Sequence, residues 1–125
     1  MMDETFWTVE FRRGTRVSTG VAIFTKGKTF GGDSGHTFMG KYAGDSSIKA
    51  NIFVHSFVSG FDVMGMGDDY ELEFAGIVEG KTMTATPNVV GHPENKLTAR
   101  LTKVTDLPEE RTEWSAVPLP DSVGE

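Results

Sequence analysis

The sequence predicts an all-β protein, an antiparallel up-and-down barrel of about eight strands. Segments in which apolar and polar residues alternate are separated by glycine-containing turns. Phe38–Gly44 and Phe74–Gly80 share the spacing F-x-G-x-x-x-G, in which an aromatic-bearing strand runs into a glycine suited to a tight turn. The 125 residues include 15 glycines and 9 phenylalanines, which suits a β domain rich in turns.

Thr5–Arg13 is the clearest expected strand, because Trp7, Val9 and Phe11 alternate with polar residues. No amphipathic helix is evident. Eight strands is the number at which a barrel encloses its side chains or one small ligand. The other expected strands are Val17–Lys26, Thr29–Gly32, His36–Ala43, Ile48–Phe57, Asp69–Val78, Lys81–Thr86 and Lys96–Val104.

Charge divides the chain into a barrel domain, residues 1–105, and an acidic proline-containing tail, residues 106–125, which we expect to be flexible. The net charge is −6, and the tail contributes −5 of it through six acidic residues and one arginine. Direct binding of nucleic acid needs a concentrated basic face, so this balance argues against it.

Cysteine is absent, which excludes disulfides and cysteine-ligated zinc. The first residues, MMDETFWTVEF, lack a basic segment followed by an apolar one, and no apolar run approaches membrane-spanning length. We therefore expect a cytoplasmic protein that does not bind membranes.

No combination of residues predicts catalysis, a metal site or a cofactor. Gly32-Asp33-Ser34-Gly35 resembles the nucleophile motif of chymotrypsin-like proteases, but those enzymes supply His and Asp before Ser, and here the first histidine is His36. The three histidines show no metal-ligand spacing. An enzyme using Asp33, His36 and Asp68 at the barrel mouth is the least favoured reading; we predict that the protein is not an enzyme.

Apolar residues suggest three surfaces. The inward positions of the strands would line a cavity for an apolar ligand or fill a solid core. Phe53 and Phe57 fall on the outer face, where they either indicate a dimer surface or are covered by a neighbouring loop. Flexible thioethers suit adaptable contacts, so the loop with Phe61, Val63, Met64 and Met66 is a candidate lid or contact loop; the alternative is that it plugs one end of the barrel. The candidate lining residues are Trp7, Val9, Phe11, Ile23, Phe38, Tyr42, Ile52, Tyr70, Leu72 and Phe74.

The order of short motifs over residues 5–104 resembles the GrlR family, negative regulators of type III secretion and related proteins of unassigned role. These motifs are G-x-A-I-F at Gly20–Phe24, Gly31-Gly32-Asp33, Phe38-x-Gly40-x-Tyr42 and the alternating strand Ile48–His55. The resemblance implies a lipocalin-like barrel that forms homodimers, accepts a lipid-like molecule and sequesters a transcriptional activator.

The family contacts its activator through a run of four acidic residues in the loop after the Tyr-x-Gly strand. Here that loop offers Asp45, Ser46 and Ser47, a single acid, so electrostatic recognition of the same basic partner loses its basis. We expect a regulatory or adaptor protein that acts by protein–protein contact as a homodimer, with a protein partner such as a transcriptional regulator. The alternative is a barrel that binds a small lipid-like molecule.

Overall fold

Ten strands form one antiparallel sheet in the computed structural model, which describes residues 2–58, 65–107, 118 and 120. Most strands follow the predicted ones within two residues at each end. The strands are β1 (Thr5–Arg13), β2 (Arg16–Thr25), β3 (Lys28–Gly32), β4 (His36–Gly44), β5 (Ser47–Ser56), β6 (Asp69–Glu79), β7 (Thr82–Ala85), β8 (Asn88–Val89), β9 (His92–Lys96) and β10 (Thr98–Asp106).

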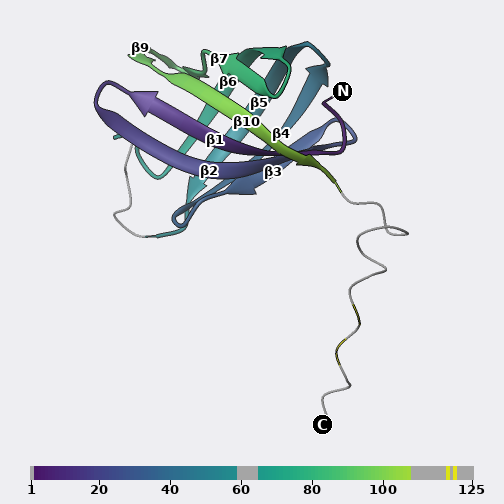
Figure 1. Cartoon of the computed structure of the whole chain (residues 1–125). Coiled ribbons are helices and arrows are strands. Elements are labelled where there is room, and N and C mark those ends of the chain that lie inside the picture. The colour runs from purple at the N-terminus through teal and green to yellow at the C-terminus, as the bar shows by residue number, and fades with distance from the viewer. Residues whose placement is uncertain (1, 59–64, 108–117, 119, 121–125) are drawn as a thin grey trace.

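The sheet closes into a barrel of eight strands, which confirms the predicted fold (Figure 1). β1 to β7 follow one another around the barrel, β5 pairs with β6, and β10 lies between β7 and β1. The short hairpin of β8 and β9 is an addition that the sequence did not predict. It is attached to β6 through Leu72 and Glu73, which pair with Val89 and Asn88.

The two F-x-G-x-x-x-G segments use their glycines differently from the prediction. Gly40 and Gly76 do not open turns: they lie inside β4 and β6. A Cβ atom at Gly76 would come within 2.9 Å of the Met83 sulfur, so a side chain there would require the buried Met83 side chain to shift. The second glycine of each segment follows the expected role, because Gly44 and Gly80 have φ values of 101° and 63° at the ends of their strands.

The barrel interior is a packed apolar core. Trp7 is 1% exposed, and its ring meets Phe24 edge-on with centroids 6.4 Å apart. Phe11 meets Phe38 in the same way at 5.7 Å. Such aromatic pairs add to the stability that burial alone provides. In the described residues every buried side-chain nitrogen or oxygen has a hydrogen-bond partner.

Residues before β1 complete this core. Met2 is 1% exposed, and its backbone amide donates to the Asp45 carboxylate at 2.7 Å. The Thr5 hydroxyl donates to the Met2 carbonyl and accepts a 2.8 Å hydrogen bond from Trp7 Nε1. The Tyr42 hydroxyl donates to Asp3, and its burial raises the pKa of Tyr42 above its ordinary value.

No helix with the length and apolarity to cross a bilayer occurs in the described ranges.

Candidate functional site

Nine of the ten residues expected to line the interior do face it. Trp7, Val9, Phe38, Leu72 and Phe74 are buried, and the half-buried Phe11, Tyr42, Ile52 and Tyr70 pack against them. Ile23 departs from the expectation. It is half-buried between the fully buried Ala22 and Phe24, so its side chain lies on the outer face of β2.

The core leaves little space for a ligand among the described residues. The interior gap beside Phe11, Val54 and Tyr70 has a volume of about 10 Å³. Small-molecule pockets are typically about 300–1,000 Å³. The apolar lining residues therefore fill the barrel in this structure.

The outer face carries a continuous row of apolar residues across five strands. The cross-strand register places each directly opposite the next, from β1 to β5. A soluble protein commonly exposes single apolar residues, but a contiguous group indicates a binding surface. We call this row the outer apolar stripe; it consists of Phe6, Ile23, Phe30, Met39 and Phe53.

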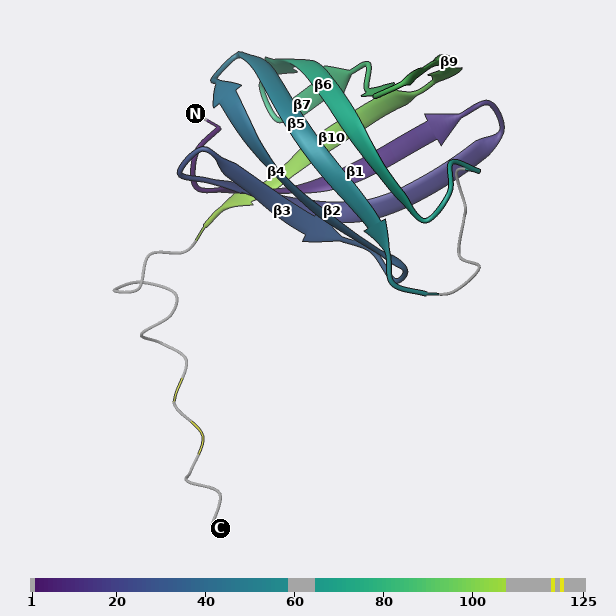
Figure 2. The same cartoon turned by 180° about the vertical axis from the view of Figure 1, so that it is seen from behind.

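Exposure increases toward the β3–β5 end of the stripe. Phe6 and Ile23 are half-buried, whereas Phe30, Met39 and Phe53 are 45%, 57% and 41% exposed. Figure 2 shows β3, β4, β5 and β6 side by side, so the exposed end of the stripe lies on one broad surface. The more exposed end is thus the part available to a partner.

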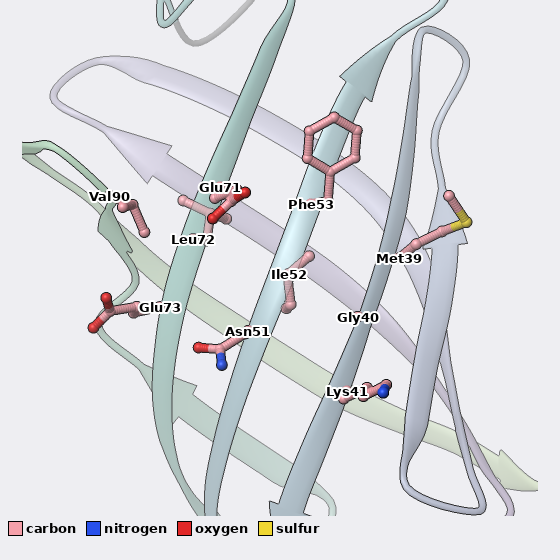
Figure 3. Close-up of a pocket in the computed structure, with 10 residues that line it drawn as sticks. All are labelled: Met39, Gly40, Lys41, Asn51, Ile52, Phe53, Glu71, Leu72, Glu73 and Val90. Carbon is pink, nitrogen blue, oxygen red and sulfur yellow. The ribbon is translucent and has the colours of Figure 1, made fainter.

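A shallow groove of about 450 Å³ adjoins this end of the stripe. Figure 3 shows Met39 and Phe53 on one part of it, with Lys41 on the β4 side and Glu71 and Glu73 on the β6 side. Val90, which is 46% exposed, lies beyond β6, on the far side of Glu71 from Phe53. The groove therefore combines exposed apolar side chains and the amide of Asn51 with charged side chains of opposite sign at its two edges.

Phe57, the second residue predicted for a dimer surface, is 54% exposed but lies outside the stripe. It follows the last residue of β5, and its amide donates to the Gly35 carbonyl at 2.9 Å. On the outer face of β5, His55 lies between Phe53 and the end of the strand, so Phe53 and Phe57 are not neighbours on that face.

The structure describes only part of the candidate lid, but it describes the whole candidate partner loop. Phe61, Val63 and Met64 lie outside the described residues; Met66 is half-buried against the core near Tyr70. In the turn Asp45-Ser46-Ser47, the Asp45 carboxylate accepts the Met2 amide and the Ser46 carbonyl accepts the Val78 amide at 2.8 Å. The one acid of that turn therefore holds the N-terminal segment.

Asp33 and His36 are close together, but their bonds fix the turn between β3 and β4. The Asp33 carboxylate accepts hydrogen bonds from the Gly35 and His36 amides, both at 2.8 Å, and from the Ser18 hydroxyl at 3.2 Å. The His36 Nδ1 atom lies 3.0 Å from the same carboxylate. The Asp68 carbonyl accepts the Ser56 amide at 2.7 Å. Among the described residues no three histidines or carboxylates come together as a metal site.

Replacing Asp33 with alanine should therefore destabilise the fold. Several hydrogen-bond donors would lose their acceptor, and we expect the free energy of unfolding to fall by about 2–3 kcal/mol. Asp33→Asn, which keeps an acceptor oxygen for the two amides, should cost less. Urea denaturation of the two variants tests this; equal stability of Asp33→Ala and wild type would contradict it.

Neither a protein-family model nor a curated protein matches the sequence.

Proposed function

We propose that this chain is a regulatory or adaptor protein that acts by protein–protein contact through the exposed end of the outer apolar stripe. The observation that carries the proposal is the direct cross-strand juxtaposition of Phe30, Met39 and Phe53, all more than 40% exposed. Apolar surface removed from water contributes roughly 25 cal/mol per Å², so covering these side chains would drive association.

The flanking charges add specificity to this surface. Protein interfaces typically surround an apolar centre with a polar rim, and rim charges select partners and orient them. Lys41, Glu71 and Glu73 occupy that position around Met39 and Phe53. The resemblance to negative regulators of type III secretion supports a contact role, and we include a cytoplasmic location in the proposal.

Two observations guide where the contact is made. The turn that corresponds to the family's acidic loop contains only Asp45 as an acid, and its carboxylate binds the Met2 amide. The barrel interior is filled, so a lipid-like ligand would require the core to open. Both observations favour the outer face, and not the turn or the barrel interior, as the place where a partner binds.

Native mass spectrometry of freshly purified protein tests a contact role against a ligand-binding one. We expect species whose masses equal two chains of 13.6 kDa, or a chain with a protein partner, without an added small mass. A monomer with a stoichiometric small-molecule adduct that leaves on collisional activation would contradict the proposal. Denatured protein provides the control mass.

A further inference from the structure

Two lysines lie side by side next to the outer apolar stripe. Lys28 on β3 and Lys41 on β4 are direct cross-strand neighbours, and both are exposed. Like charges opposite each other in a sheet destabilise the pairing of the strands. Neither lysine forms an ion pair with any residue in the ranges that the structure describes. An anionic group bound between them would relieve this repulsion.

The two lysines border the most exposed part of the stripe. Phe30 and Met39 are the next outward-facing pair on the same two strands, and they are 45% and 57% exposed. Successive outward residues of a strand lie roughly 7 Å apart. A segment that carries an acidic side chain next to a large apolar one would therefore contact both pairs at once.

The chain leaves the barrel beside the other end of this stripe. The cross-strand row of the stripe continues onto β10, where Thr105 lies opposite Phe6. Two residues later, the Leu107 amide donates a 2.8 Å hydrogen bond to the Glu4 carbonyl. This bond holds Leu107 next to the residue that precedes β1, so the segment that follows starts near the half-buried end of the stripe.

The sequence after Leu107 has the chemistry that this surface would bind. Residues 108–125 include five acids and one arginine, and Glu113 directly precedes Trp114. Residues 108–117 lie outside the described residues. An extended chain spans at most about 24 Å over the seven residues from Leu107 to Trp114. Phe30 is on β3, two strands from β1, which is about 10 Å at the level of the backbone. The segment is therefore long enough to reach it over the curved surface.

We propose that residues 108–117 fold back over the stripe, with Trp114 on Phe30 and Met39 and Glu113 at the two lysines. This closed form exchanges with an open form in which the stripe is uncovered, as it is in the structure. A tethered segment acts at an effective concentration of about millimolar, so modest contacts are enough to hold it. The proposal rests on the proposed function, because a partner would have to displace the segment to bind. The segment would thus regulate the contact surface of its own chain.

Acrylamide quenching of tryptophan fluorescence tests this in the whole chain, at concentrations where it sediments as a monomer. The chain has two tryptophans, and Trp7 is 1% exposed, so the quenching reports on Trp114. The variant Trp114→Phe gives the background from Trp7. We expect Trp114 in folded wild type to be protected relative to urea-unfolded protein. Lys28→Glu/Lys41→Glu should shift the equilibrium about tenfold toward the open form, because exposed attractions become repulsions.

Two further variants test whether the lysine pair is the docking point. Lys96→Glu/Arg100→Glu changes the charge by the same amount at exposed residues of β9 and β10, and it should leave Trp114 protected. Adding Glu110→Lys/Glu113→Lys to Lys28→Glu/Lys41→Glu exchanges the signs on both sides, so the protection should return. Circular dichroism checks that every variant folds.

Three results would overturn the inference. These are a Trp114 that is quenched as readily in folded as in unfolded wild type, unchanged protection in Lys28→Glu/Lys41→Glu, and equal loss of protection in the Lys96→Glu/Arg100→Glu control. Failure of the proposed function is a separate outcome. A protein contact in native mass spectrometry without protection of Trp114 would overturn only this inference. Protection of Trp114 in a chain that forms no protein contact would overturn the proposed function and leave the folding back of the segment in place.

Discussion

Replacing Trp7 with alanine should lower the free energy of unfolding by about 3–5 kcal/mol. The indole is almost fully buried, packs edge-on against Phe24, and donates a 2.8 Å hydrogen bond to Thr5. Truncation would remove this apolar area and leave a cavity. Small domains have total stabilities of about 5–15 kcal/mol, so the loss would be a large part of the whole.

Phe6→Ala provides the matched control, since Phe6 is the adjacent aromatic residue of β1 and is half-buried on the opposite side of the strand. It should cost clearly less stability than Trp7→Ala. Urea unfolding of both variants, monitored by far-UV circular dichroism, measures the difference. An equal effect of the two substitutions would contradict the assignment of Trp7 to the core and Phe6 to the outer face.

The strands were predictable because in most of them apolar and polar residues alternate along the sequence. In β5 and β6 each inward apolar residue is separated by an outward polar or charged one, apart from Phe53 and the last part of β6. The hairpin of β8 and β9 gave no such pattern. β8 has two residues and β9 reads His-Pro-Glu-Asn-Lys, so local preference does not account for them; β8 is held by pairing with β6, and β9 by pairing with β8.

Ile23 shows where alternation is ambiguous. Val21, Ala22, Ile23 and Phe24 are all apolar, so the sequence does not indicate which side of β2 is buried. Pairing with β1 decides it, because Ala22 lies opposite the buried Trp7 and Ile23 lies opposite Phe6.

Most of the outer apolar stripe was missed because its members are far apart in the sequence. Only Phe53 was identified. The two-residue turn Lys26-Gly27 carried usable information: it pairs Thr25 with Lys28 and therefore places Ile23 opposite Phe30. Extending that register to Met39 and Phe53 depends on the next turns, Asp33–Gly35 and Asp45-Ser46, whose lengths cannot be predicted from the sequence with the accuracy that a register needs.

Introducing two lysines into the stripe, Met39→Lys/Phe53→Lys, should abolish self-association while leaving the fold intact. Both side chains are largely exposed and contribute little to the core. A partner that binds this face would cover both side chains, so the two lysines would lose their hydration on association. Losing two central apolar contacts should raise the Kd at least about 100-fold.

Sedimentation velocity of wild type and Met39→Lys/Phe53→Lys over a concentration series tests the use of this face most directly. Thr84→Lys/Thr98→Lys is the control, because it adds the same charge to exposed positions on β7 and β10. We expect wild type and the control to sediment as dimers and Met39→Lys/Phe53→Lys as a monomer. Sedimentation of that variant as a dimer, or dissociation of the control to the same extent, would contradict the assignment of the outer apolar stripe as the contact surface.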